Sequence, residues 1–186
     1  MKKILYFDTE TTGRKPLINE IHQIGIIIEI NGEVKFKGEF KTRPLITDQI
    51  VQEALEVSGV TEKEILKYPH PVDTYKKIIT LLGQYVDKYD PTDKFYPAGY
   101  NVKFDLEFLQ QYFLYQDDKF LGSWFNWRSI DPLNHLYSMD CKGEINLPNY
   151  QLKTVCKHFN INLENAHDAM ADIEATRKLI KKMNLV

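Results

Sequence analysis

The feature that most restricts the fold is a two-residue link between two segments that have the pattern of strands. Residues 22–30 are mostly apolar, and Asn31-Gly32 joins them to residues 34–42, where apolar and charged side chains alternate. Asn and Gly tolerate the positive φ angles of a type I′ turn, so the link predicts an antiparallel hairpin. The chain is therefore expected to build a sheet that contains at least one antiparallel pair.

Residues 4–7 give a different strand signal, because they are apolar on both faces. Such a strand is typical of the middle of a sheet. Short strands are also expected at 95–99 and 127–131, and a surface loop at 138–150. Apolar residues at three- and four-residue steps predict helices after an N-cap at Thr47-Asp48 and over residues 72–89, 101–115, 150–159 and 168–183. The expected fold class is α/β, with a mixed sheet flanked by helices.

Length and composition are those of one ordinary domain. The chain has 186 residues, of which 43% are hydrophobic and 27% charged, so it can bury a sizeable core. We therefore expect a single domain over residues 1–186. The formal net charge of −2 provides no global positive field. A polyanion would have to be held by local charges or by bound metal.

The cysteines and the N-terminus indicate a soluble, cytoplasmic protein. Cys141 and Cys156 form no CxxC pattern, which argues against a disulfide framework and against a zinc knuckle. The apolar run that follows Met1-Lys2-Lys3 is too short for a signal peptide. No segment approaches the roughly 18 to 20 apolar residues that span a bilayer, so no membrane partner is expected.

Asp8 and Glu10 follow directly after the first expected strand. Side chains two residues apart in a strand point to the same side, about 7 Å apart, at the end of the sheet where open α/β folds place ligands. Such carboxylates repel each other unless cations neutralise them. The structural alternative is that Asp8 caps the turn at Thr11-Thr12-Gly13 and that Glu10 is simply solvated.

Three further residues have ordinary explanations when each is taken alone. Asp105 falls in the first turn of an expected helix, where an acid stabilises the helix dipole by about 0.3–1 kcal/mol. Asp172 lies one turn into the last expected helix, at the border of its apolar stripe, where an acid usually reaches water. His167, just before that helix, is unremarkable by itself.

Taken together, three segments resemble the exonuclease motifs of the DnaQ-like 3′-to-5′ exonucleases, the DEDD group. They are Phe7-Asp8-Thr9-Glu10-Thr11-Thr12-Gly13, Asn101-Val102-Lys103-Phe104-Asp105 and His167-Asp168-Ala169-Met170-Ala171-Asp172. The resemblance runs from Lys3 to about Leu179. The family that the chain resembles includes the proofreading epsilon subunit of DNA polymerase III. It implies a ribonuclease H-like fold, two divalent ions (Mg²⁺ or Mn²⁺), and removal of nucleotides from the 3′ end of a nucleic acid.

The resemblance also implies roles for single residues. The metal-binding acids match Asp8, Glu10, Asp105 and Asp172, and the general base matches His167. Members with a histidine base place it five residues before the last Asp, as here, whereas members with a tyrosine base place it four residues before. Five helical residues turn a side chain by about 140°, so His167 is expected on the loop that enters the helix, with Asp168 as N-cap. An imidazole titrates near neutral pH and can accept a proton from the attacking water.

In relatives, the residues after the first motif hold the terminal nucleotide. Thr11, Thr12 and Gly13 are therefore candidate substrate-binding residues, with turn chemistry as the alternative. Asn101 and Phe104 complete the second motif, and helix capping and core packing explain them equally well. The aromatic segment 119–128 could stack on unpaired bases, but core filling is favoured. The basic end of the last helix reads as a solvated face: Arg177, Lys178, Lys181 and Lys182.

The expected function is metal-dependent 3′-to-5′ hydrolysis of single-stranded DNA, releasing nucleoside 5′-monophosphates. One alternative is an exoribonuclease that resembles ribonuclease T or oligoribonuclease, because the catalytic set is indifferent to the 2′-hydroxyl. Another is a non-catalytic module that binds nucleic acid or a polymerase. The expected partner is the 3′ end of single-stranded DNA or RNA, with a DNA polymerase or a homodimer mate as further candidates. The expected helices leave no C-terminal tail of the kind that binds a polymerase.

Overall fold

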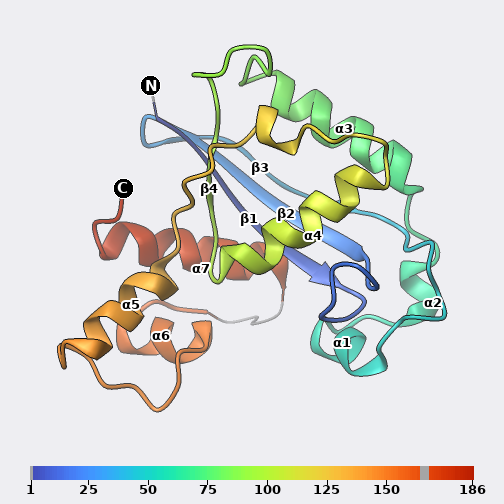
Figure 1. Cartoon of the computed structure of the whole chain (residues 1–186). Helices are drawn as coiled ribbons and strands as arrows, with labels where there is room; N and C mark the ends of the chain where they lie inside the picture. Colours follow the sequence, from blue (N-terminus) through green and yellow to red (C-terminus); the bar gives the residue numbers. More distant parts are fainter. Residues whose placement is uncertain (1, 164–167) are drawn as a thin grey trace.

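The computed structural model describes residues 2–163 and 168–186. Four strands form one sheet in the order β3-β2-β1-β4 (Figure 1): β1 (Lys3–Thr11), β2 (Ile21–Ile30), β3 (Glu33–Lys41) and β4 (Tyr96–Ala98). β1 pairs with β2 and β2 pairs with β3 in antiparallel fashion, whereas β4 runs parallel to β1. The expected mixed sheet flanked by helices is confirmed.

The hairpin between β2 and β3 turns at the predicted link. Asn31 has a φ angle of 53° and Gly32 one of 84°, the positive values that these two residue types accept most readily. The antiparallel register begins next to the turn, with Ile30 opposite Glu33. This part of the fold follows directly from the local sequence.

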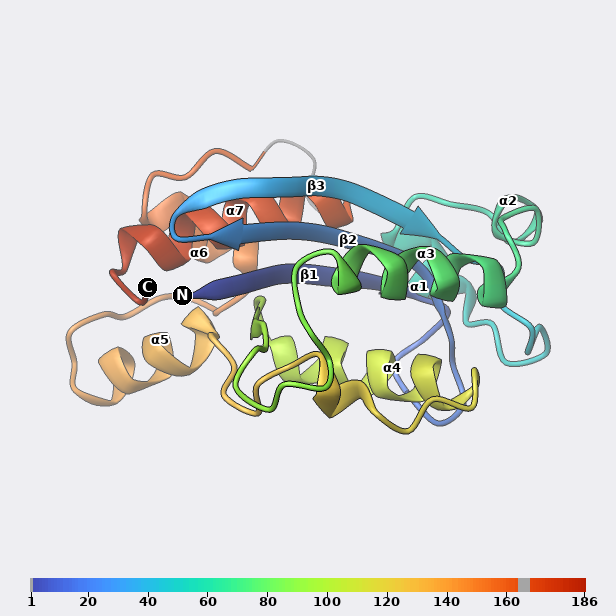
Figure 2. The same ribbon diagram turned by 90° about the horizontal axis from the view of Figure 1, so that it is seen from above.

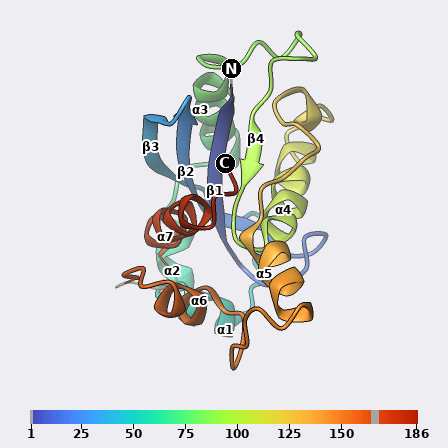
Figure 3. The same ribbon diagram turned by 90° about the vertical axis from the view of Figure 1, so that its left-hand side faces the viewer.

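Helices cover both faces of the sheet, as Figure 2 shows: α3 (Pro71–Gly83) and α4 (Val102–Leu114) lie on one side, and α7 (Ala169–Lys182) on the other. Two shorter helices pack against α7 (Figure 3): α5 (Pro132–Cys141) and α6 (Leu152–His158). Two more lie beyond the carboxyl end of β1: α1 (Gln52–Val57) and α2 (Glu62–Ile65). None of the helices in the described part of the chain is both long and apolar enough to cross a membrane.

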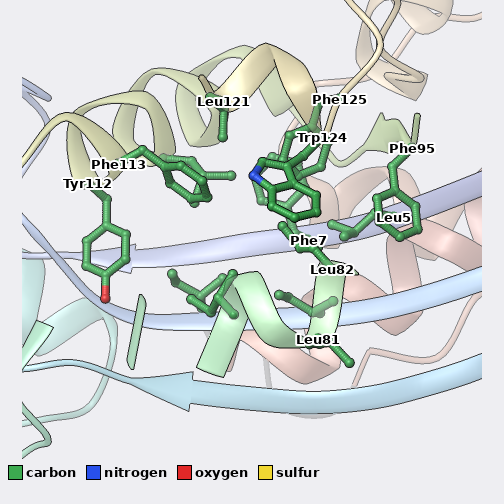
Figure 4. Close-up of a cluster of buried hydrophobic side chains, with 14 of the residues drawn as sticks. Leu5, Phe7, Leu81, Leu82, Phe95, Tyr112, Phe113, Leu121, Trp124 and Phe125 are labelled. Atoms are coloured by element: carbon green, nitrogen blue, oxygen red, sulfur yellow. The ribbon is translucent and has the colours of Figure 1, made fainter. Parts of the chain in front are cut away.

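β1 is buried on both faces, as its sequence predicts. Leu5 and Phe7 belong to the core under α3 and α4, whereas Ile4 and Tyr6 belong to the core under α7. Figure 4 shows Leu5 and Phe7 among the aromatic side chains of the first core. This alternation assigns each residue of β1 to one of the two helical layers.

The aromatic segment 119–128 divides between core and surface. A short 3-10 helix, η1 (Leu121–Ser123), leads into Trp124 and Phe125, and both of these rings are buried against the core in Figure 4. Core filling is thus confirmed for these two residues. Phe120 and Trp127, however, are 70% and 86% exposed.

Several predicted boundaries are wrong. The first helix does not start after Thr47-Asp48, because Asp48 and Gln49 form only a turn and the backbone is extended again at Val51, the N-cap of α1. α3 ends at Gly83 instead of Tyr89, and turns fill the remaining residues. α2 was not predicted, although Thr61 and Glu64 form a capping box at its start.

The region after η1 also departs from expectation. Residues 127–131 are not a strand. Within this segment, Ile130 makes an isolated bridge to Ala98, the last residue of β4. α5 occupies residues 132–141, part of which was expected to be loop. The sequence does contain a helix-start signal here that the prediction did not use. Asp131 is the N-cap, its carboxylate accepts the Leu133 amide proton at 2.9 Å, and Pro132 follows at the first helical position.

The basic end of α7 is not simply a solvated face. Glu29 of β2 is 2% exposed, and its Oε2 lies 2.5 Å from Arg177 Nη2 and 2.9 Å from Lys181 Nζ. Burial would raise the pKa of Glu29, but hydrogen bonds and charge from Lys181 and Arg177 hold that pKa below its usual range. The pairs attach α7 to the sheet.

Candidate active site

The candidate site lies at the carboxyl end of β1, where the two faces of the sheet contribute different residues. Asp8 and Glu10 follow the alternation of Ile4 and Tyr6, so they belong to the α7 side of the strand. Thr9 points to the opposite side, toward α4, and is buried. Two carboxylates therefore leave the strand on one side, as their spacing predicts.

Asp105 joins them from the first turn of α4. It is 3% exposed, and its Oδ1 accepts two hydrogen bonds from Thr9, one from the amide at 2.9 Å and one from the hydroxyl at 2.7 Å. These bonds fix the carboxylate against the end of β1. The role of Asp105 as a mere dipole-stabilising acid does not explain this burial, because such an acid would remain in water.

The start of α7 carries two more acids. Asp168 is the N-cap, as predicted, and its carboxylate accepts the amide proton of Ala171 at 2.9 Å. Asp172 follows one turn later, and its amide donates to the Asp168 carbonyl at 2.9 Å. Both carboxylates interact electrostatically with Asp8. The two acids of the last motif are thus close enough to the end of β1 to act on Asp8.

Gly25 explains why α7 can come so close. It is the residue of β2 directly opposite Asp8. A Cβ atom at this position would lie 2.6 Å from Ile173 Cδ1 and 3.3 Å from the backbone of Ala169. A side chain at this position would require the end of the Ile173 side chain to move and the backbone at Ala169 to shift by a few tenths of an ångström, which would disturb the start of α7.

The acids interact strongly. Burial raises the pKa of Asp8 well above its usual range, and the charges of four neighbours raise it further: Asp105, Glu10, Asp172 and Asp168. Burial raises the pKa of Asp105 to about 7, although the hydrogen bonds from Thr9 act in the lowering direction. This concentration of negative charge disfavours full ionisation unless a cation is present.

The donor set suits hard divalent cations. The four acids of the motifs supply only carboxylate oxygens, which Mg²⁺ and Mn²⁺ prefer. Within residues 2–163 and 168–186, no three Asp, Glu, His or Cys side chains are already closed around one point as a ligand shell. The acids therefore fit a metal site by chemistry and mutual charge, and coordination would require their side chains to converge. The candidate base, His167, lies outside the described residues and remains a prediction from sequence.

A pocket of about 610 Å³ opens beside Glu10. We call it the end pocket. Its walls are the loop after β1, the start of α4 at Phe104, and α1 with Ser58 just after it. The Ser58 hydroxyl donates to Glu10 Oε2 at 2.6 Å and so fixes one carboxylate at the rim. Nothing local in the sequence links Ser58 to Glu10, so sequence reasoning missed it.

The Thr-Thr-Gly segment serves mainly as a turn. Thr11 Oγ1 donates to the Gly13 carbonyl at 2.7 Å, and both residues line the end pocket. Thr12 is completely buried, and its hydroxyl accepts the Glu20 amide proton at 2.9 Å. The geometry thus favours the structural alternative for the Thr12 side chain. Asn19, which sequence reasoning also missed, packs against Gly13 and fixes the loop by donating to the Gln49 carbonyl at 2.7 Å.

The second motif supplies one pocket residue and one turn residue. Phe104 lines the end pocket, with its ring centroid 4.8 Å from that of Phe108. Asn101 sits at the N-cap of α4 in the left-handed region, with φ 59°, and its side chain makes no capping bond. The carboxylate of Asp131 caps α4 instead, accepting the amide protons of Asn101 and Val102 at 3.1 Å. The capping role expected for the Asn101 side chain is therefore wrong.

Comparison with known sequences places this geometry in a family. The family model described as Exonuclease (RNase_T) matches residues 5–180. DNA polymerase III PolC-type of Halalkalibacterium halodurans is 27% identical over 184 residues, covering 97% of this chain and 11% of the relative. The protein of the same description from Oceanobacillus iheyensis is 25% identical over 177 residues, covering 95% and 11%. The chain thus spans about a tenth of the length of these relatives.

Solved structures show the same fold. The structure titled "The structure of exonuclease I suggests how processivity is achieved" superimposes with a TM-score of 0.81 at 24% identity and covers 100% of this chain and 41% of that one. E. coli exonuclease I in complex with a dT13 oligonucleotide gives a TM-score of 0.76 at 27% identity, covering 97% and 41%. The fold is therefore ribonuclease H-like, and the chain belongs to the exonuclease family, among its DnaQ-like members.

Proposed function

We propose that this chain is a metal-dependent 3′-to-5′ exonuclease that acts on single-stranded DNA and releases nucleoside 5′-monophosphates. The observation that carries the proposal is the acid cluster at the carboxyl end of β1, directly beside the open end pocket. Asp8, Glu10, Asp105 and Asp172 are the metal-binding acids in this proposal. Residues 1–186 would act as one exonuclease domain, with the four acids at one end of a single sheet.

The end pocket is suited to a single terminal nucleotide. Phe104 offers an aromatic surface, Thr11 and Gly13 offer the loop backbone, and exposed Arg14 and Lys15 add positive charge to a rim that also holds Glu10. A strand that ends in this pocket would place its last phosphodiester near the acids. The geometry thus supports removal of nucleotides from an end.

Bound Mg²⁺ or Mn²⁺ would offset the charge of the phosphate and of the leaving oxygen. The protein's part is to hold the carboxylates in place, and two of them are fixed by hydroxyl groups: Asp105 by Thr9 and Glu10 by Ser58. His167 is proposed as the base that accepts a proton from the attacking water, because it stands five residues before Asp172. Thr12 and Asn101 would act only by shaping the loops that bear the pocket.

The choice of DNA is supported by one relative in particular. Exonuclease I, which shares 27% identity over nearly the whole chain, has been solved with a single-stranded dT13 oligonucleotide. The PolC-type relatives are DNA polymerases by description, which makes association with a DNA polymerase the partner hypothesis for this chain. A homodimer is the other partner hypothesis, and sedimentation of the purified chain alone tests it.

The first experiment measures hydrolysis of the p-nitrophenyl ester of thymidine 5′-monophosphate. We expect turnover with Mg²⁺ or Mn²⁺, none with EDTA, and a loss of about 100-fold or more in Asp8→Asn. Asp73→Asn, an exposed acid in the first turn of α3, is the matched control and should keep full activity. Turnover that persists in Asp8→Asn would contradict the site, and no turnover with either metal would favour a binding module.

The second experiment separates the possible substrates. Single-stranded DNA and RNA oligomers of equal sequence, labelled at the 3′ end, are digested side by side at several lengths. We expect faster release of the labelled mononucleotide from DNA. Faster release from RNA would establish the exoribonuclease alternative, and early appearance of longer labelled fragments would contradict exonucleolytic action.

A further inference from the structure

A second, larger hollow of about 890 Å³ runs along α4. We call it the α4 groove. Its walls are the exposed side of α4 from Lys103 to Gln111, the loop after β1 at Leu17, and the segment that ends at Trp127. The eight helical steps from Lys103 to Gln111 correspond to a length of about 12 Å. The groove is long enough for several groups in a row.

The α4 groove and the end pocket are lined by neighbouring residues of the same two segments. Lys103 lines the groove, and the next residue, Phe104, lines the end pocket. Likewise, Leu17 lines the groove and Lys15 lines the end pocket. The two hollows therefore share the same two walls, the loop after β1 and the start of α4. A strand with its end in the end pocket would reach the groove by crossing these two segments.

The side chains of the groove suit bases and phosphates. The Trp127 ring is 86% exposed, and the guanidinium carbon of Arg128 lies 5.1 Å from its centroid. Lys94 and Lys103 add positive charge, against a single acid in the lining, Glu107, which is 3.8 Å from Lys103. This local excess of positive charge contrasts with the net charge of −2 of the whole chain. Flat aromatic surface combined with basic side chains is the usual chemistry of single-strand binding.

We infer that the α4 groove binds the unpaired nucleotides upstream of the 3′-terminal one, and that the Trp127 ring stacks on one of their bases. This inference rests on the proposed function, because it fixes the end of the strand in the end pocket. Trp127 would be a substrate-binding residue that contributes affinity for long strands and contributes nothing to bond cleavage. Sequence alone favoured core filling for the aromatic segment, which holds for Trp124 and Phe125 but not for Trp127.

The test compares Trp127→Ala, Trp127→Phe and Phe120→Ala in the full chain. Phe120 is a matched control, since it is 70% exposed in the same segment but does not line the groove. We expect Trp127→Ala to weaken binding of a single-stranded 12-mer by about 5- to 50-fold while leaving turnover of the p-nitrophenyl ester, which has no upstream nucleotide, within twofold of wild type. Trp127→Phe should recover most of the affinity, and Phe120→Ala should match wild type.

Binding is measured with Ca²⁺ by anisotropy of a labelled 12-mer and by tryptophan fluorescence. Since Trp124 is buried and Trp127 exposed, the 12-mer should quench the wild-type signal more than that of Trp127→Phe. Equal 12-mer affinity in wild type and Trp127→Ala would overturn the inference, as would a change in oligomeric state confined to Trp127→Ala. If the wild type binds the 12-mer through Trp127 but hydrolyses neither substrate, the groove stands and the proposed catalysis fails.

Discussion

Two hydroxyl side chains hold two acids of the candidate site in place. Thr9 donates to Asp105 from its hydroxyl and also from its amide, and the Ser58 hydroxyl donates to Glu10 at 2.6 Å. Hydrogen bonds to charged groups contribute about 1.5–3 kcal/mol each. Both hydroxyls would favour the ionised acids and therefore oppose the mutual repulsion of the carboxylates.

Ser58→Ala tests this role. Without its hydrogen bond, Glu10 should be less well placed, so we expect about a tenfold loss of turnover at low Mg²⁺ and partial recovery as the Mg²⁺ concentration rises. Ser58→Thr should retain activity. Ser138→Ala, at an exposed serine of α5, is the matched control. A loss that is the same at every Mg²⁺ concentration would contradict a role through the metal-binding acid.

His167→Asn tests the proposed base. We expect turnover to fall by about 100-fold or more while the KM for the p-nitrophenyl ester changes little, because the imidazole accepts a proton without holding the substrate. The residual activity should rise with pH as hydroxide replaces the lost base. His135→Asn, at an exposed position in α5, is the control. Full activity of His167→Asn across pH 6 to 9 would show that another group is the base.

His22 predicts a pH dependence of stability. It is fully buried in β2, and burial followed by the charge of Lys41 lowers its pKa from 6.5 to about 4. The folded state thus binds fewer protons than the unfolded state between these values. His22 therefore costs no stability above pH 6.5 and destabilises the fold as pH falls toward 4, by about 3 kcal/mol in full.

Replacing His22 by Leu should remove this term. We expect the free energy of unfolding of His22→Leu to fall less steeply than that of wild type between pH 6.5 and 4, as measured by urea titration. His158→Leu, at an exposed histidine of α6, should follow the wild-type curve. Parallel curves for His22→Leu and wild type would mean that the histidine titrates normally.

The position of α7 depends on contacts made far from the acids along the chain. Gly25 lets the start of the helix approach β2, and Glu29 attaches the later turns through Arg177 and Lys181. Both residues belong to the same strand. β2 therefore sets the distance between Asp172 and the end of β1.

Gly25→Ala should displace the start of α7. The new Cβ would meet Ile173 Cδ1 at 2.6 Å, and such overpacking costs about 1–3 kcal/mol. We expect the Tm to fall by only a few degrees. Nuclease activity should fall strongly, since Asp172 moves with the helix. Ile173→Val removes the clashing methyl group, so the double variant should regain activity. Failure of the second substitution to restore any activity would contradict the steric explanation.

The elements differ in how far local sequence determines them. The β2–β3 turn was predictable because Asn31 and Gly32 alone favour its backbone. The start of α1 was not, since Thr47-Asp48 begins only a turn, and Val51 then donates its amide proton to the distant Thr12 carbonyl at 2.8 Å before the helix starts. The start of α5 had an unused signal in Asp131-Pro132.

Over the whole molecule, the order of the motifs predicted the fold and identified the candidate acids, whereas contacts between distant segments remained hidden. Asp8, Glu10, Asp105 and Asp172 were identifiable as a set. The partners that position them, such as Ser58 for Glu10, come from parts of the chain with no motif of their own. The sequence does not show that the Trp124 ring is buried and the Trp127 ring exposed, because the tertiary structure decides it.

A crystal structure with Mn²⁺ and thymidine 5′-monophosphate tests the central claim most directly, because anomalous scattering locates the metal independently of activity. We predict two Mn²⁺ peaks about 3.5–4 Å apart at the end of β1, in contact with oxygens of Asp8, Glu10, Asp105 and Asp172, and the nucleotide in the end pocket. Asp8→Asn crystals should lose at least one peak. Peaks elsewhere, or none at this end of the sheet in protein that degrades DNA, would contradict the account.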